Sequence, residues 1–418
     1  MKVASIELFR VRLPFRIRFE HRAAARKESA GLVTRIALAD GTVGWGEGVP
    51  REYVTGENVE SSAQAVREFY VPLVRPWRPA DFGQAAAGAA ALPTLSKEGR
   101  VFNAARCSVE LALFDAYGRC FREKLSAAAA YLPGPGTPAP EQISAADQGV
   151  STAGTRAGAR ASGERYPPVA TAVLPAGGPL KVRWLYRAFR TAGFRDFKLK
   201  VGFPDDERRF GFILAIAGRK DQKKITVRAD SNGAWTSPEA EKNMTTLMRT
   251  GVLLFEQPLA KDDWEGYRRL ASGIGPRAVI LDESLLTIED ARRAARERWS
   301  QGFNIRISKN GGFCPSLEIA RLAGAHGIRI YLGAMVGETG ILAAAQRHLL
   351  AVAPLVTAVE PAFNRFLLKR DIVRKSRRGR WAIKPRSLER DCPGFGLGIE
   401  IDEKAMTRFG ESIFRAAF

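Results

Sequence analysis

Three apolar segments of this chain each run into a carboxylate: Val227-Arg228-Ala229-Asp230-Ser231-Asn232, Leu253-Leu254-Phe255-Glu256-Gln257-Pro258 and Val279-Ile280-Leu281-Asp282-Glu283-Ser284. The three acids are evenly spaced, 26 residues apart. The flanking segments, Phe197-Lys198-Leu199-Lys200 and Ile305-Arg306-Ile307-Ser308-Lys309-Asn310-Gly311-Gly312, end on lysine instead. The pattern predicts five short strands that carry charged side chains at their C-terminal ends.

The same strand-then-helix rhythm extends on both sides of this stretch. Val169–Leu174 is a predicted first strand, and later strands are predicted to end near residues 200, 230, 256, 282, 308, 333 and 360. Predicted helices alternate with them, for example at 179–192, 288–301 and 315–326. Eight such units favour a closed parallel (β/α)₈ barrel. An open doubly wound sheet is the main alternative, but no Gly-x-Gly-x-x-Gly turn is present.

The first 131 residues lack this strand–helix alternation and are predicted to form an α+β capping domain. Predicted strands at 3–9, 32–38 and 43–47 are joined by polar loops, Arg16–Ser29 among them, and Pro50–Glu57 follows as a further loop. A helix is predicted at 104–121. Residues 132–167 are rich in Gly, Ala and Pro, so we predict a flexible insertion there. The barrel then occupies 168–372, and 373–418 is a C-terminal segment returning to the capping domain.

In a (β/α)₈ barrel the C-terminal strand ends meet on one face, where active sites lie. Asp230, Glu256 and Asp282 would come from consecutive strands and would repel one another unless a cation joins them. Hard oxygen ligands favour Mg²⁺. The alternative is that each acid only pairs with a surface arginine.

Lys198 and Lys200 are two residues apart, so on a strand they share one face. Lys200 is the predicted base, because a neighbouring cation, a metal and burial would lower a lysine pKa. Lys309 follows a strand four positions further around the ring, which is diametrically opposite. Two lysines that flank a metal suit the removal of a proton α to a carboxylate.

Together these motifs resemble the enolase superfamily, specifically its muconate lactonizing enzyme subgroup. The likeness includes Gly44-Trp45-Gly46-Glu47 and the tail 394–401, and it spans most of the chain outside 132–167. The resemblance implies that Asp230, Glu256 and Asp282 bind Mg²⁺, with Mn²⁺ as a substitute, and that Lys200 and Lys309 are the acid/base pair. Lys198 would tune Lys200, and Asn232 and Glu283 would support the metal ligands.

The resemblance leaves the reaction open. It implies a Mg²⁺-dependent isomerase acting on a small carboxylate, either a cycloisomerase or a racemase/epimerase, with a lyase of the same superfamily as the alternative. Dipeptide epimerases of the subgroup carry Asp-x-Asp at the eighth strand, where this chain has Val359-Glu360-Pro361. Glu338, after the seventh predicted strand, is either a site residue or an acid at a helix start.

Composition sets the remaining expectations. The formal net charge is +21, and basic residues are dense between Arg365 and Arg386. No nucleic-acid-binding motif accompanies this cluster, so we expect a solvated basic surface and not a nucleic-acid site. Four scattered cysteines indicate a reducing compartment, and no signal peptide or membrane span is evident. We expect a cytoplasmic homo-oligomer.

Overall fold

The computed structural model describes residues 1–21, 24–95, 99–132, 168–175, 178–203, 205–211, 213, 225–275, 278–361, 367–374 and 393–418. The predicted insertion lies outside these residues apart from Leu132, as does most of the basic cluster between Arg365 and Arg386. Among the described helices, none combines the length and the apolar character that crossing a bilayer requires.

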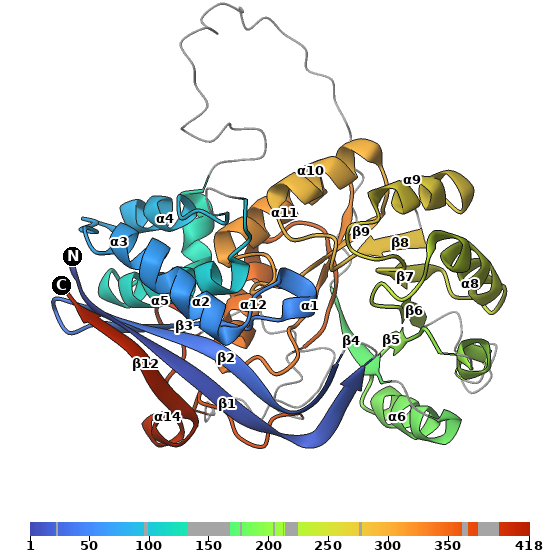
Figure 1. Cartoon of the computed structure of the whole chain (residues 1–418), viewed down its shortest axis with the longest axis horizontal. Helices are drawn as coiled ribbons and strands as arrows, with labels where there is room; N and C mark the ends of the chain where they lie inside the picture. Colours follow the sequence, from blue (N-terminus) through green and yellow to red (C-terminus); the bar gives the residue numbers. More distant parts are fainter. Residues whose placement is uncertain are drawn as a thin grey trace, which may run out of the picture.

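Eight parallel strands close into a barrel, which confirms the predicted fold class (Figure 1). The strands are β4 (Val169–Leu174), β5 (Asp196–Lys200), β6 (Thr226–Asp230), β7 (Leu254–Glu256), β8 (Val279–Leu281), β9 (Gly302–Ile305), β10 (Arg329–Leu332) and β11 (Val356–Val359). Helices between them include α6 (Pro179–Thr191), α8 (Ser237–Arg249), α9 (Trp264–Gly273), α10 (Ile288–Glu297), α11 (Phe313–Ala325) and α12 (Gly340–Val352).

Alternation along each strand decides which side chains enter the barrel. On β5, Phe197 packs on Tyr186 of helix α6, with ring centroids 4.8 Å apart. Because successive side chains on a strand point to opposite faces, Lys198 and Lys200 project into the barrel interior. The sequence alone predicted this shared face.

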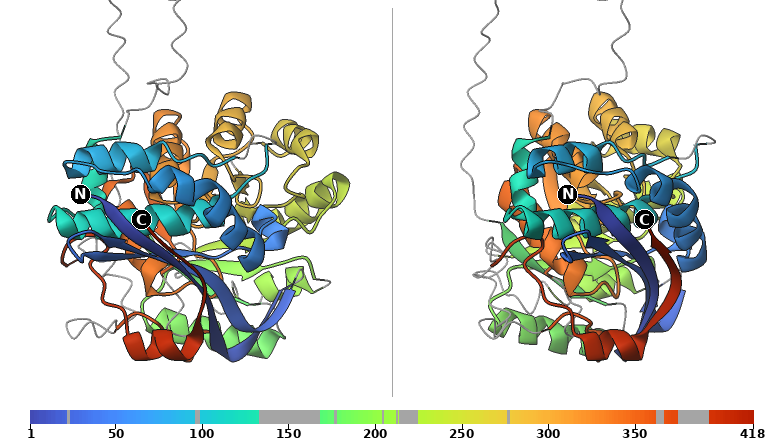
Figure 2. Two further views of the ribbon diagram at one scale, coloured as in Figure 1. Left: turned by 60° about the vertical axis from the view of Figure 1, so that its left-hand side comes forward. Right: turned by 90° about the vertical axis from the view of Figure 1, so that its left-hand side faces the viewer.

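A separate antiparallel sheet forms the capping domain. Its strand order is β12-β1-β2-β3, with β1 at Val3–His21, β2 at Ala24–Leu38, β3 at Val43–Gly48 and β12 at Gly410–Ala417. Its helices include α1 (Glu52–Thr55), α2 (Val59–Ala65), α3 (Val71–Val74), α4 (Phe82–Ala90) and α5 (Asn103–Cys120), and α14 (Glu403–Phe409) precedes β12. Since β12 pairs with β1, the two chain ends lie near each other (Figure 2).

The predicted loop at Arg16–Ser29 was wrong. Strands β1 and β2 continue through most of it as a long antiparallel ribbon, with Phe19 opposite Arg26 and His21 opposite Ala24. Polar side chains do not prevent this, because the backbone groups of each strand are satisfied by the other. The second predicted loop, at 50–57, contains the short helix α1.

Strand β3 and helix α5 approach each other unusually closely. A Cβ atom added to Gly44 would lie 2.1 Å from Ala116 N, and one added to Gly46 would lie 2.0 Å from Ser108 O. Gly48 meets Ala104 O at 2.0 Å in the same way. Only residues without a side chain allow the α5 backbone to lie directly on this strand.

We therefore expect Gly46→Ala to lower the free energy of unfolding by about 3 kcal/mol or more, because the added methyl group overlaps backbone that cannot move aside. Denaturant titration of the purified variant measures the change. The control is Gly211→Ala, at an exposed helical position with nothing within 4 Å of the added Cβ. Equal stability of the two variants would contradict the close packing of β3 on α5.

Candidate active site

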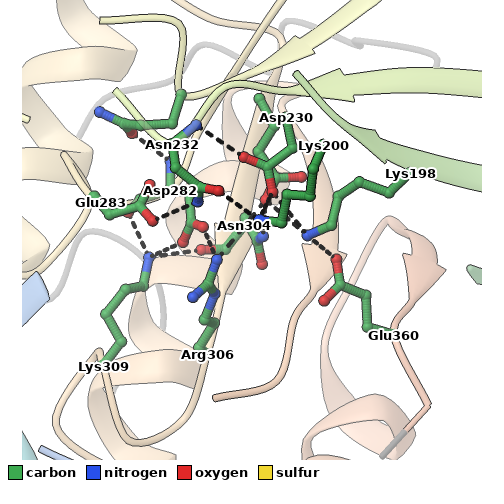
Figure 3. Close-up of polar contacts among 12 residues, drawn as sticks. Lys198, Lys200, Asp230, Asn232, Asp282, Glu283, Asn304, Arg306, Lys309 and Glu360 are labelled. Carbon is green, nitrogen blue, oxygen red and sulfur yellow. Dashed lines mark hydrogen bonds and ion pairs between the residues drawn. The ribbon is translucent and has the colours of Figure 1, made fainter. Parts of the chain in front are cut away.

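The charged strand ends gather at one mouth of the barrel, as the sequence predicted (Figure 3). Lys200 on β5 is in register with Asp230 on β6, and Asp230 is in register with Glu256 on β7. Glu256, however, pairs with Ile280, so Asp282 follows two residues beyond this row. The stagger between neighbouring strands that closes a barrel accounts for this offset.

Seven side chains at this mouth form a series in which positive and negative charges alternate. In order they are Lys200, Asp230, Lys198, Glu256, Arg306, Asp282 and Lys309. Asp230 Oδ2 lies 2.7 Å from Lys200 Nζ and 3.4 Å from Lys198 Nζ. Glu256 Oε1 lies 3.0 Å from Lys198 Nζ and 3.9 Å from Arg306 Nη2. Asp282 contacts Arg306 through Oδ2 and lies 3.1 Å from Lys309 Nζ through Oδ1. Each carboxylate is thus neutralised from both sides.

Lys198 is the buried lysine at the centre of this series of charges. Its ammonium contacts Glu256, Asp230 and Glu360. Burial alone would lower the pKa of Lys198, but the carboxylates around it outweigh burial and raise the pKa above its ordinary value.

Among the three lysines in this series of charges, Lys200 has the most exposed side chain. Its side chain is 17% exposed, whereas those of Lys198 and Lys309 are 2% and 0% exposed. Lys200 Nζ donates to Asp230 Oδ2 and, at 2.5 Å, to Asn232 Oδ1. Asn232 in turn donates to Glu283 at 3.0 Å, so both predicted supporting residues lie near Lys200.

Burial, followed by the charge of Asp230, raises the pKa of Glu283. Asn232 has a left-handed backbone with φ of 47°, a conformation that asparagine adopts more readily than most residues. The turn after β6 therefore directs the side-chain amide of Asn232 toward Lys200.

Lys309 lies in the turn that follows β9 and not at the end of the strand itself, which stops at Ile305. Its ammonium donates to the backbone carbonyls of Asp282 at 2.6 Å and Asn304 at 2.8 Å. Burial, and then the charge of Arg306, lower the pKa of Lys309 well below its ordinary value. Lys309 is thus enclosed in the wall of the site.

Helix α5 of the capping domain holds this turn in place. Asn103 donates to Lys309 O at 2.6 Å, and Arg106 donates to Gly311 O at 2.6 Å. Glu110 accepts from the first backbone amides of α11, at Phe313 and Cys314. A carboxylate at a helix N-terminus is favoured by the helix dipole. The capping domain therefore shapes the barrel mouth directly.

Sequence reasoning missed three residues of this site, namely Asn304, Arg306 and Arg228. Asn304 donates to Glu256 Oε1 at 2.7 Å, and Arg228 lies beneath Lys198 and contacts Glu360 at 3.5 Å. Asn304 and Arg306 are two residues apart around a buried strand end, as Lys198 and Lys200 are. The same alternation rule could have found them.

Glu360 and Glu338, which the sequence left undecided, have separate positions. Glu360 follows β11 and bridges Lys198 and Arg228, whose charges outweigh burial and lower its pKa. Glu338 accepts from Met335 N at 2.9 Å, and its other oxygen is buried without a hydrogen-bond partner. Burial and the charge of Glu47 raise the pKa of Glu338 well above its ordinary value. At the start of α12, Thr339 accepts from Ile341 N, and Glu47 accepts from Thr339 N and Leu342 N.

The residues fit a divalent cation by their chemistry, although the acids do not form a ready cage. Among the residues that the structure describes, no three acidic, histidine or cysteine side chains are grouped to hold a metal ion. Lysine and arginine cations are inserted between the acids. Yet Glu256 Oε2 is buried and accepts no hydrogen bond, so this carboxylate has an oxygen to offer.

Comparison with known proteins places the chain in a family. The sequence model described as Enolase C-terminal domain-like matches residues 182–405, more than half of the chain. N-succinyl-L-Arg/Lys racemase of Bacillus cereus is 24% identical over 367 residues, covering 86% of this chain and 87% of that protein. Muconate cycloisomerase 1 of Pseudomonas putida is 31% identical over 217 residues, covering 51% of this chain and 55% of the other.

A solved structure supports the same fold. The muconate lactonizing enzyme of Pseudomonas putida superposes with a TM-score of 0.76 at 23% identity, over 98% of this chain and 100% of the other. The chain therefore belongs to the enolase superfamily, in the group of mandelate racemase and muconate lactonizing enzyme. It is an enzyme of the isomerase class, as are these relatives and the similar L-Ala-D/L-Glu epimerase of Bacillus subtilis.

Glu360→Gln should lower the free energy of unfolding by about 3 kcal/mol or more, since two buried cations then lose a shared counter-charge. Denaturant titration of the purified variant measures this change in the free energy of unfolding. The matched control is Glu265→Gln, whose ion pair with Arg268 is 56% exposed on both sides and should be worth no more than about 0.5 kcal/mol. If both variants lose the same small amount, Glu360 does not neutralise the interior.

A pH dependence follows from Glu47, whose pKa burial raises from 4.5 to about 7. The folded state keeps its proton longer than the unfolded state, so this contribution to stability is complete below about pH 4.5 and disappears as the pH rises through 7. Unfolding free energies across this window should fall more steeply for the natural protein than for Glu47→Gln. Parallel pH profiles would show that Glu47 does not titrate this way.

Proposed function

We propose that this enzyme moves a proton at the carbon next to a substrate carboxylate, with Lys200 as the group that takes up and returns the proton. The observation that carries the proposal is the position of Lys200. Of the three lysines in the charge series it has the most exposed side chain, and it lies at the strand end beside Asp230. The substrate is a small carboxylate.

The three acids between the lysines support a metal-assisted reaction. Asp230, Glu256 and Asp282 would hold Mg²⁺ or Mn²⁺, for which their oxygens are suited. When bound, such an ion supplies positive charge that stabilises a substrate carboxylate as negative charge builds on it. Lys198, whose pKa the surrounding carboxylates raise, would add positive charge in the same interior.

The proton transfer itself uses groups of this chain. Lys200 as a free amine takes the proton, the carbon–hydrogen bond breaks, and its electron pair delocalises into the adjacent carboxylate. The resulting ammonium is held by Asp230 Oδ2 and Asn232 Oδ1, the two acceptors that it already contacts. Return of the proton to that carbon completes an isomerisation. In a ring closure a substrate carboxylate oxygen would instead add to a carbon–carbon double bond, the electron pair of that bond would delocalise into the adjacent carboxylate, and the Lys200 ammonium would then supply the proton.

The relatives suggest the first probes: cis,cis-muconate, N-succinyl-L-arginine and L-Ala-D-Glu, each incubated with Mg²⁺ in D₂O. We expect deuterium incorporation or ring closure with at least one probe, seen by mass spectrometry and NMR. A mass decrease of one water would instead identify a lyase. Chelation of the metal should stop turnover, and added Mg²⁺ should restore it.

Lys200→Ala should reduce turnover by at least about 10²-fold, the usual contribution of a general acid or base. The control is Lys242→Ala, which removes an exposed lysine of α8 and should leave turnover unchanged. Full activity of Lys200→Ala would remove Lys200 from the mechanism.

A further inference from the structure

The turn that links β9 to α11 carries Lys309, and the capping domain bonds to it at successive residues. Val49 N, which follows strand β3, donates to Ser308 Oγ at 2.8 Å. Asn103, the first residue of α5, donates to Lys309 O at 2.6 Å. Two neighbouring positions of the turn are thus held by groups from outside the barrel.

Asn103 also bonds to the adjacent turn of the barrel, the one that follows β8. Its side-chain nitrogen donates to Leu286 O at 2.9 Å as well as to Lys309 O, so one buried amide joins the two turns. The Lys309 amine lies at the junction of the same two turns, 2.6 Å from Asp282 O. The two bonds of Asn103 therefore fix how closely the turns approach each other, and with that the place of the Lys309 amine.

The amine of Lys200 is held differently. Its acceptors are Asp230 at the end of β6 and Asn232 in the turn after β6, and Asn232 is held in turn by Glu283. All three of these partners belong to the barrel. Strands β5 and β9 are four places apart in the eight-stranded ring, so Lys200 and Lys309 lie on opposite sides of the mouth (Figure 3). Of the two lysines, Lys309 is the one whose position depends on a capping-domain side chain.

We propose that Asn103 is a positioning residue for Lys309, and that the capping domain thereby controls proton transfer on one face of the substrate only. The inference rests on the function proposed above, with Lys309, the second lysine predicted from the sequence, serving the opposite face. Lys200 takes the proton from one face of the α-carbon, and the electron pair of the broken bond delocalises into the carboxylate. Lys309 in its protonated form then gives a proton to the other face of that carbon, and the reverse reaction exchanges the two roles.

The barrel has its own bond between the same two turns, because Asn310 donates to Leu285 O at 2.8 Å. This bond remains when Asn103 is replaced, so we expect an Asn103 variant to fold and to change only locally. Without Asn103, two backbone carbonyl oxygens lose a donor, and the folded state of the turn loses the advantage of those bonds over an opened one.

The first test needs no substrate. The folded natural protein and Asn103→Ala are treated with trace acetic anhydride, and acetylation of each lysine is measured by mass spectrometry relative to the unfolded protein. Asn103→Ala should raise acetylation of Lys309 by about tenfold, because local opening limits access to a buried amine and the lost bonds favour opening. Acetylation of Lys200 should stay as it is in the natural protein.

The matched control is Asn58→Ala, which removes an asparagine of the same domain that caps helix α2. The bonds of Asn58 to Ser61 N and Glu52 stay within the capping domain, so this variant should raise acetylation of neither lysine. An equal rise at both lysines in Asn103→Ala, or no rise at Lys309, would overturn the proposal. If Asn103→Ala does not fold, Asn103→Ser, whose hydroxyl has a shorter reach, replaces it with the same expected contrast.

The second test separates the two faces of the substrate. N-succinyl-L-arginine and N-succinyl-D-arginine are each incubated with Mg²⁺ in D₂O, and exchange of the α-proton is followed by NMR. Asn103→Ala should slow exchange of one enantiomer by about tenfold or more, and Lys200→Ala should slow exchange of the other. Equal slowing of both enantiomers by Asn103→Ala would contradict a role on one face. If the natural protein exchanges neither, the proposed function fails for these probes, and acetylation alone decides whether Asn103 positions Lys309.

Discussion

Three carboxylates that converge at one barrel mouth repel one another, and the rest of this structure depends on how that repulsion is relieved. Four cationic side chains lie among Asp230, Glu256 and Asp282, so that neighbouring charges alternate in sign from Lys200 to Lys309. In a low-dielectric interior an unpaired charge is costly, so each member holds its neighbours in position.

The surrounding fold maintains this arrangement from two directions. Below it, Glu360 pairs with both Lys198 and Arg228, and the charge of Glu360 helps to raise the pKa of Lys198. Beside it, Asn103 and Arg106 of α5 bond to the turn that carries Lys309. The close packing of α5 on the glycines of β3 thus reaches the site, because a shifted helix would move the turn after β9.

Much of the fold was predictable because barrel strands repeat at regular intervals and end in polar residues. The parallel barrel, the shared face of Lys198 and Lys200, and the gathering of Asp230, Glu256 and Asp282 all follow from that pattern. The ribbon of β1 and β2 was not predictable, because its pairing satisfies the backbone and leaves little trace in a polar sequence. The position of Asp282 beyond the row of Glu256 depends on strand stagger, which composition does not encode.

The amino-acid sequence by itself determined the inventory of this site: two lysines two residues apart, three evenly spaced acids, and a strand end carrying both arginine and lysine. Only the tertiary structure decided the surroundings of Arg306 and Lys309. Three positions separate them, and their contacts depend on where β9 stops and how the next turn bends. The carbonyls of Asp282 and Asn304 enclose the Lys309 ammonium, while alternation past Asn304 leaves the Arg306 guanidinium inside the barrel. Such a difference arises from contacts between distant segments, which no local pattern records.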